Sequence, residues 1–269
     1  MGGVFSSPLN DAVFPRTGRP HHNEKKLREE YGFHTVGNIF SIKEIPGDKT
    51  LVSVCLHGNL EVVSNSVPQW GFLCNARAII GLEYPGYGMR GDEEASEQSI
   101  LAEIPRWIHA LDDSGFKKNI VVCGRSLGSF VAIHLAISLG ERCAGLVLVS
   151  PMLTAIATKI KSPWYRIGSA FDLLDNETAA SKLSEKIPVL LIHGEKDTVV
   201  PEWNSEELYL VLKRRRNAYV RREVIKNCGH NNLMGERQVR EIVQSFFNLC
   251  EDRINGRDNV PPSINTKVR

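Results

Sequence analysis

The chain has 269 residues, a formal net charge of +2, 42% hydrophobic residues and 24% charged residues. This composition is typical of a globular protein with enough apolar residues for a sizeable core. The slight positive charge, without aromatic residues interleaved among basic ones, argues against nucleic acid as a partner. We find neither an apolar run of about 18 residues nor a secretory signal, so we expect a cytoplasmic protein. Six scattered cysteines without a C-x-x-C pair indicate buried thiols, and we expect no metal and no cofactor.

In chain order, residues 1–30 are polar, contain three prolines, and are expected to form an arm that precedes a folded domain over 31–254. From residue 31 onward, apolar runs alternate with amphipathic stretches. The predicted strands are Leu51–Leu56, Ala78–Leu82, Ile120–Cys123, Ala144–Val149, Val189–Ile192 and Tyr219–Ile225. The predicted helices are Trp70–Cys74, Ile100–Leu111, Leu127–Leu139, Glu206–Lys213 and Val239–Cys250.

This alternation predicts an α/β fold with a doubly wound, mostly parallel sheet and helices on both faces. Residues 152–186 are longer than a simple crossover requires, so we expect a short cap or lid there. Residues 255–269 contain two adjacent prolines and are expected to form a disordered tail.

A serine stands between two glycines where a predicted strand meets a predicted helix. The stretch "VVCGRSLGSF" has the pattern G-x-S-x-G, with Ser126 flanked by Gly124 and Gly128. In a nucleophile elbow the serine occupies a strained turn, and side chains two residues away would collide with the strand and the helix. An ordinary strand-to-helix turn with a capping serine is the alternative.

Two further polar residues follow later strands. Asp197 comes after the run "VLLIHG", and His230 follows the last predicted strand. Sites in open parallel sheets form at the carboxyl ends of strands, so Ser126, Asp197 and His230 are predicted to meet as a catalytic triad. In such a triad the histidine takes the serine proton and the aspartate orients the imidazole. Taken singly, Asp197 fits a turn and His230 fits a loop before a helix.

An acyl-transfer site also needs donors for the oxyanion. The backbone N–H of Leu127, directly after the serine, is one candidate. The stretch "LHGN" ends the first predicted strand, and its tight turn aims the backbone N–H of Asn59 at the same point. A plain strand-ending turn is the alternative.

The stretches "LHGN", "EYPGYG", "GRSLGS", "PVLLIHGEKDTVVP" and "GHNN" together resemble the α/β-hydrolase fold. More narrowly, the chain is similar to small, cap-poor α/β-hydrolase-domain proteins that include protein depalmitoylases, over about residues 31 to 250. The resemblance implies that Ser126, Asp197 and His230 are catalytic and that Asn59 supplies an oxyanion amide. The chain departs from this family in two places: "MRGDEEASE" replaces a serine-containing and proline-containing stretch after Gly88, and no cysteine precedes Cys55.

The N-terminus offers a different lipid anchor. "MGGVFS" fits the N-myristoylation pattern at Gly2, with Ser6 at the favoured position. One myristoyl chain binds a membrane only marginally, so a second contact is needed. The basic residues available are Arg16, Arg19, Lys25, Lys26 and Arg28, together with "LKRRR" at 212–216, Arg221 and Arg222. A small-residue start without lipid, and a solvated helix end at 212–216, are the alternatives.

These observations predict a serine hydrolase that cleaves acyl esters or thioesters through an acyl-enzyme. The resemblance and the lipid motif favour a lipidated membrane protein as substrate, at the cytosolic face of a membrane. A serine peptidase of the prolyl-oligopeptidase type is one alternative, although those enzymes normally carry a propeller domain. A non-catalytic binding protein on the same fold is another alternative, which the intact triad disfavours.

Overall fold

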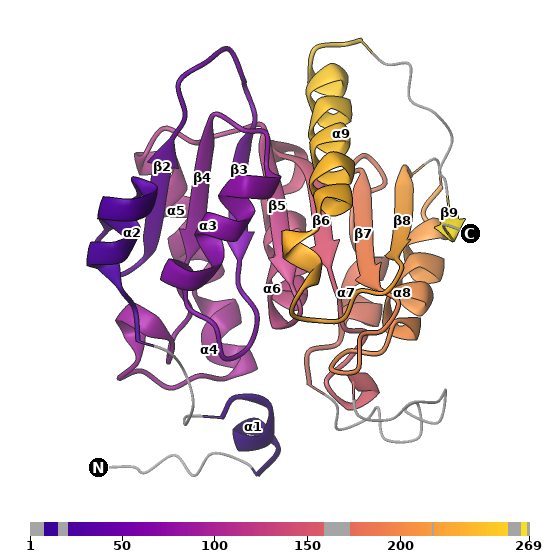
Figure 1. The fold of residues 1–269 in the computed structure, drawn as a ribbon, viewed down its shortest axis with the longest axis horizontal. Helices are drawn as coiled ribbons and strands as arrows, with labels where there is room; N and C mark the ends of the chain where they lie inside the picture. Colours follow the sequence, from indigo (N-terminus) through magenta and orange to yellow (C-terminus); the bar gives the residue numbers. More distant parts are fainter. Residues whose placement is uncertain (1–7, 16–20, 159–172, 217, 258–264, 268–269) are drawn as a thin grey trace.

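The centre of the molecule is a twisted, mostly parallel β-sheet (Figure 1). The computed structural model describes residues 8–15, 21–158, 173–216, 218–257 and 265–267. Within these residues the strand order is β1-β2-β4-β3-β5-β6-β7-β8-β9. Strands β1 and β2 are antiparallel to their neighbours, and the remaining pairs are parallel. The strands are β1 (His34–Val36), β2 (Phe40–Glu44), β3 (Val52–Leu56), β4 (Ala78–Leu82), β5 (Ile120–Arg125), β6 (Cys143–Val149), β7 (Val189–Gly194), β8 (Val220–Ile225) and β9 (Asn265–Lys267).

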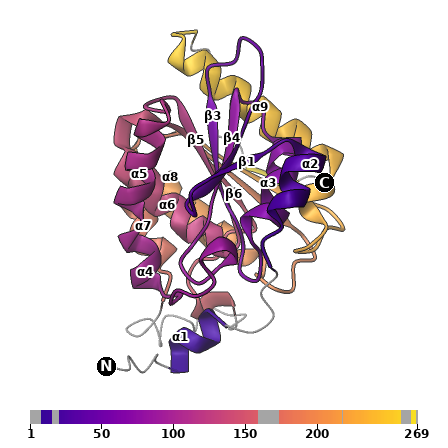
Figure 2. The ribbon, with the colours of Figure 1, turned by 90° about the vertical axis from the view of Figure 1, so that its left-hand side faces the viewer.

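Helices cover both faces of this sheet (Figure 2). One face carries α2 (Glu24–Tyr31), α3 (Val63–Leu73) and α9 (Arg237–Ile254). The other face carries α4 (Glu97–Ala102), α5 (Ile104–Asp113), α6 (Leu127–Leu139), α7 (Asn176–Ser181) and α8 (Trp203–Lys213). A separate hydrophobic core lies between the sheet and the helices on each face, because the central strands have apolar side chains on both faces. The predicted α/β fold with a doubly wound sheet is therefore confirmed.

Two helices differ from the predicted bounds because of prolines. The predicted helix Ile100–Leu111 consists of α4 and α5, and Pro105 stands in the first turn of α5. Proline has no N–H to donate to the preceding turn, so a new helix starts there. Helix α3 begins much earlier than predicted, at Val63, and runs through Pro68. The buried side chains of Val67 and Trp70 fix this helix on the sheet despite the lost hydrogen bond.

The described part of the predicted N-terminal arm packs against the domain. Helix α1 (Pro8–Val13) lies beyond the carboxyl ends of the parallel strands (Figures 1 and 2). Phe14 and Leu27 are each 1% exposed, in the cores of opposite sheet faces. Among the described residues, no helix has the length and apolar character needed to span a membrane.

The predicted lid and tail are described only in part. The described ends of 152–186 carry a 3-10 turn at Ile156–Thr158 and helix α7, and its centre, 159–172, lies outside the described residues. Helix α9 ends at Ile254. Within the segment 255–269, which we expected to be disordered, Asn265–Lys267 pairs with β8 as strand β9. The remaining tail residues, 258–264 and 268–269, are not described.

Candidate active site

Ser126 occupies the turn between β5 and α6. Its backbone has φ 53° and ψ −118°, which is a rare conformation for a residue other than glycine. A Cβ at Gly124 would lie 2.3 Å from the carbonyl oxygen of Gly128, and a Cβ at Gly128 would lie 2.4 Å from that of Leu56. Backbone cannot yield as a flexible side chain would, so a side chain at either position would force the backbone to move. The chain therefore holds Ser126 on a strained, closely packed strand–turn–helix unit.

Asp197 and His230 meet in the loops that follow β7 and β8. The distance from His230 Nδ1 to Asp197 Oδ2 is 2.7 Å. The other carboxylate oxygen, Oδ1, accepts backbone N–H bonds from Val199 and Val200, at 3.0 and 2.9 Å. Burial opposes ionisation of Asp197, but hydrogen bonds from His193, His230 and the Val200 amide outweigh it and hold its pKa well below the ordinary value. This side chain is a carboxylate at neutral pH, fixed toward one imidazole nitrogen.

The candidate oxyanion residues share a cavity with the serine. Asn59, Ser126 and Leu127 line a cavity of about 150 Å³, and the other lining residues are mostly apolar. They are Ala12, Val13, Met152, Ala155, Thr158, Leu174, Val199 and Val200. Leu127 begins α6, so its N–H lies at the positive end of the helix dipole. An acyl group in this cavity would meet both the serine and the two candidate donors.

The structure brings the predicted residues together in two groups. Ser126, Asn59 and Leu127 share the cavity, and Asp197 and His230 form a pair. No hydrogen bond joins Ser126 to His230 among the described residues, and in unliganded enzymes such bonds are often long. The two groups are linked through Arg125, directly before Ser126, which donates to the carbonyl oxygen of His230 at 2.8 Å.

Aromatic and acidic residues that sequence reasoning did not single out hold the loop of Asn59. The Tyr84 hydroxyl donates to the carbonyl of His57 at 2.9 Å, and the Tyr87 hydroxyl donates to Asn59 Oδ1 at 2.7 Å. His57 Nε2 lies 2.9 Å from Glu83 Oε1, and neither side chain is exposed. The motif "EYPGYG" was the sequence signal for these contacts, since it contains Glu83, Tyr84 and Tyr87.

The N-terminal helix also reaches this loop. The amide Nδ2 of Asn59 donates to the carbonyl oxygen of Val13 at 2.7 Å. Because Ala12 and Val13 line the cavity as well, the helix α1 forms part of the candidate site. Gly2, the predicted lipidation residue, lies outside the described residues.

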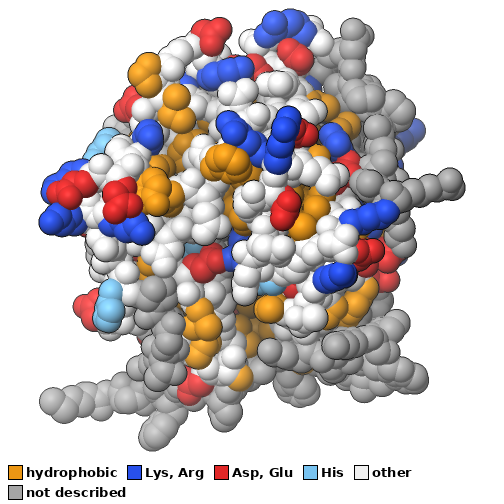
Figure 3. Space-filling model, in the orientation of Figure 1, with side chains coloured by type: hydrophobic (Ala, Val, Ile, Leu, Met, Phe, Trp, Pro, Cys, Tyr) orange, Lys and Arg blue, Asp and Glu red, His pale blue; other side chains and the backbone are white. Residues whose placement is uncertain are grey.

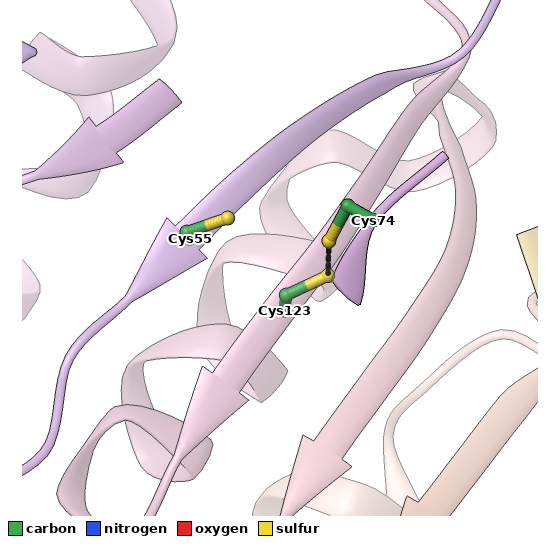
Figure 4. A group of neighbouring side chains, drawn as sticks. All are labelled: Cys55, Cys74 and Cys123. Atoms are coloured by element: carbon green, nitrogen blue, oxygen red, sulfur yellow. Dashed lines mark hydrogen bonds between the residues drawn. The ribbon is translucent and has the colours of Figure 1, made fainter. Parts of the chain in front are cut away.

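Three cysteines gather in the core on the face of the sheet that α3 covers (Figure 4). The sulfur atoms of Cys55, Cys74 and Cys123 lie within 4.8 Å of one another, close enough for a soft metal ion. Metal ligation needs thiolates, and burial raises the pKa of Cys55 and Cys123 well above the ordinary value. Burial also opposes ionisation of Cys74, but hydrogen bonds with its neighbours outweigh it and lower the pKa of that thiol. The Ser53 hydroxyl lies within hydrogen-bond distance of all three sulfur atoms, and the rest of the surrounding core is apolar, so this group fits packed, hydrogen-bonded thiols.

The predicted basic residues differ in their accessibility. Lys25, Lys26 and Arg28 are exposed, whereas Arg222 is fully buried and pairs with Glu202. Figure 3 shows one face of the molecule, on which lysine and arginine side chains are interspersed with acidic ones. Arg222 is therefore unavailable to a membrane surface, contrary to the expectation that it adds a basic contact.

Comparison with known proteins supports the same fold. The sequence model of the prolyl oligopeptidase family matches residues 100–256. A Xenopus tropicalis protein, alpha/beta hydrolase domain-containing protein 17C, is 28% identical over 176 residues, which are 65% of this chain and 52% of that protein. The putative alpha/beta hydrolase L404 of Acanthamoeba polyphaga mimivirus is 29% identical over 174 residues, covering 62% of each chain. The chain thus spans about half to two thirds of the length of these relatives.

Solved structures agree in architecture. The monoacylglycerol lipase of Paleococcus ferrophilus superposes with a TM-score of 0.57 and 18% identity, over 78% of this chain and 98% of that one. At this identity the likeness shows the α/β-hydrolase fold alone. The family match covers more than half of the chain, including the elbow and the loops of Asp197 and His230. The chain therefore belongs to the prolyl oligopeptidase family and has the α/β-hydrolase fold.

Proposed function

We propose that this protein is a serine hydrolase that cleaves acyl esters or thioesters, with Ser126 as nucleophile. The observation that carries the proposal is the position of Ser126 on a strained elbow, in an apolar cavity shared with Asn59 and Leu127. The second support is the pair of His230 and Asp197 on the neighbouring loops.

The proposed reaction proceeds in two halves. His230 takes the proton of the Ser126 hydroxyl as the oxygen bonds to the substrate carbonyl carbon. The resulting oxyanion accepts hydrogen bonds from the backbone amides of Asn59 and Leu127. Collapse breaks the bond to the leaving group, which takes the proton from His230. A water molecule then gives a proton to His230 as its oxygen bonds to the acyl carbon. Collapse breaks the bond from that carbon to the Ser126 oxygen, which takes the proton back from His230, and the acid is released.

The cavity favours an apolar acyl group as the bound part of the substrate. Side chains such as Val13, Leu127, Met152 and Leu174 would contact a hydrocarbon chain without leaving polar groups unpaired. The polar side chains among the described lining residues are limited to Asn59, Ser126 and Thr158, so a polar or charged acyl group would find few partners there. Fatty acyl esters and thioesters are therefore the proposed substrate class.

A peptidase is the second candidate, and the match to the prolyl oligopeptidase family favours it. The same triad hydrolyses amides, so the distinction lies in the substrate and not in the nucleophile. If neither esters and thioesters nor peptides are turned over, the remaining candidate is a non-catalytic binding protein on the same fold.

A substrate panel tests these candidates. Wild type, Ser126→Ala and Ser114→Ala are assayed on p-nitrophenyl esters of increasing chain length, acyl thioesters and peptide anilides. Ser114 is an exposed serine at the end of α5, which makes it a matched control. We expect wild type and Ser114→Ala to hydrolyse esters and thioesters faster than anilides, and Ser126→Ala to be inactive. Faster anilide hydrolysis would favour the peptidase, and ester turnover by Ser126→Ala would refute the nucleophile.

We propose also that the protein acts at the cytosolic face of a membrane, anchored by a myristoyl group on Gly2. Helix α1 begins at Pro8, six residues after Gly2, and ends against the cavity through Ala12 and Val13. A lipid at Gly2 would thus place the site close to the membrane surface, with Lys25, Lys26 and Arg28 as further contacts. An acylated membrane protein is the substrate that this arrangement suits.

A further inference from the structure

Arg125, the residue before Ser126, connects the candidate nucleophile to the loop of His230. Its Nη2 donates to the carbonyl oxygen of His230 at 2.8 Å and to Oδ1 of Asn231 at 3.3 Å. The side chain is 8% exposed and comes from the end of β5. This hydrogen bond joins Arg125 and His230, which are 105 positions apart in the chain, next to the elbow.

The second branch of the Arg125 guanidinium reaches the loop that carries Asn59. Its Nη1 forms an ion pair with Glu61. The other carboxylate oxygen of Glu61 accepts the backbone N–H of Gly58 at 2.7 Å. A Cβ at Gly58 would lie 3.0 Å from Glu61 and 3.5 Å from Arg125, so the loop lies tightly against this ion pair. Gly58 directly precedes the amide that we propose as an oxyanion donor.

We propose that Arg125 is a positioning residue, which holds the His230 loop and, through Glu61, the Asn59 loop in their places around Ser126. The inference rests on the proposed function. A guanidinium is a planar fork with donors in fixed directions, so it can bridge two loops with one rigid group. Acyl transfer needs such rigidity, because a displacement of about 1 Å in a reacting group costs on the order of 100-fold in rate.

The charge of Arg125 has partners within the site. Burial lowers the pKa of Arg125, and the charge of Asp197 opposes this effect. Together with the Glu61 contact, this gives the buried cation two anions, one of which is the proposed triad carboxylate. Loss of the guanidinium would leave the Glu61 carboxylate and the His230 carbonyl without their partner, and both loops would move.

A role limited to stability predicts different results. A purely structural ion pair would lower the melting temperature without changing the turnover of molecules that remain folded. A positioning role predicts that kcat falls while KM changes little, because Arg125 lies behind the elbow and is absent from the lining of the cavity. It also predicts that free guanidinium, which can occupy the vacated space, restores part of the lost rate.

The test compares wild type, Arg125→Ala, Arg125→Lys, Glu61→Gln and Arg142→Ala. Arg142 is a matched control, since it also pairs with a carboxylate, Asp112, and donates to a backbone carbonyl, but at the amino end of β6. The measurements are kcat and KM on an ester, the rate of fluorophosphonate labelling, and the melting temperature, each with and without guanidinium well below denaturing concentrations.

We expect Arg125→Ala to lower kcat and the labelling rate by about 100-fold with nearly unchanged KM, and guanidinium to recover part of both. Arg125→Lys and Glu61→Gln should show smaller losses in the same direction, and Arg142→Ala should keep the wild-type rate. If Arg125→Ala does not fold, these two conservative variants carry the test.

Two outcomes separate this inference from the proposed function. A wild-type protein that neither labels nor turns over ester refutes the proposed function. An active wild type together with variants of Arg125 and Glu61 that retain its kcat, whatever their melting temperatures, refutes the positioning role alone.

Discussion

At the scale of single residues, the position of the Asp197 carboxylate determines how His230 can act. It contacts His230 Nδ1 at 2.7 Å, which leaves the other ring nitrogen to accept a proton from Ser126. Asp197→Asn keeps the shape and loses the charge, so it favours the wrong imidazole tautomer. We expect ester turnover to fall by about 10⁴-fold, as judged from wild-type and variant kcat. Retention of most of the activity would show that another group orients the base.

The same carboxylate makes stability depend on pH. The pKa of Asp197 is lower in the folded than in the unfolded state, so its contribution is fully present above the unfolded value of about 4. That contribution is lost as pH falls from there toward the lower folded pKa. We therefore expect the stability difference between wild type and Asp197→Asn to stay constant from neutral pH down to about 4 and to shrink from there to pH about 3. Urea unfolding at several pH values measures it, and a constant difference would contradict the assigned pKa.

At the scale of elements, the approach of α6 to β3 and β5 depends on two glycines. Gly124→Ala would place a methyl group 2.3 Å from the Gly128 carbonyl oxygen, so backbone must move. We expect a loss of unfolding free energy of about 3 kcal/mol, at the upper end of overpacking, and a lower labelling rate of Ser126. Gly235→Ala is the control, because a Cβ there would have no neighbour within 4 Å. Equal urea midpoints for the two variants would refute the packing argument.

The elements were predictable where the pattern of side chains is local. Strands β3 to β7 consist mostly of buried apolar residues, which is why their sequence runs identify them. Strand β8 carries Arg221, Arg222 and Glu223 between its apolar ends. Strands β1 and β2 escaped prediction because they are short and lie toward one edge of the sheet. No residue of β1 is buried, and only the first three residues of β2 are buried, so neither strand forms a long apolar run. Most of α3 was not predicted, because Pro68 disfavours a helix in its middle. The helix is stabilised by packing rather than by intrinsic propensity.

The candidate site was predictable for residues that directly follow strands. Ser126, Asp197 and His230 could be placed at one edge of the sheet from the topology alone. The contacts of Glu83 and Arg125 could not be predicted, because their partners are a side chain 26 positions away and a backbone carbonyl 105 positions away. Nothing in the spacing of the sequence specifies which of many buried or charged residues will face each other across loops.

At the scale of the whole molecule, we expect anchoring and activity on membrane substrates to be linked. Gly2→Ala removes the acceptor for the myristoyl group and should shift the protein from the membrane to the soluble fraction. High salt should release part of the wild type as well, because each basic residue near an anionic surface contributes only about 1 kcal/mol. Fractionation of cells that express each form measures both effects.

The soluble Gly2→Ala variant provides its own control. It should keep full activity on a short, dissolved thioester and lose activity on an acylated protein in a bilayer. Equal membrane association of both forms would remove the lipid anchor from the account. Equal activity on the bilayer substrate would separate anchoring from function.

The central claim is that Ser126 is the nucleophile of an acyl-transfer site. The most direct measurement is the mass of the protein after reaction with a fluorophosphonate, followed by peptide mapping of the adduct. We predict a single adduct on Ser126, lost in Ser126→Ala, retained in Ser114→Ala, and formed slowly in His230→Ala. An adduct on another residue, or equal labelling of Ser126→Ala, would contradict the assignment of this serine and of the site built around it.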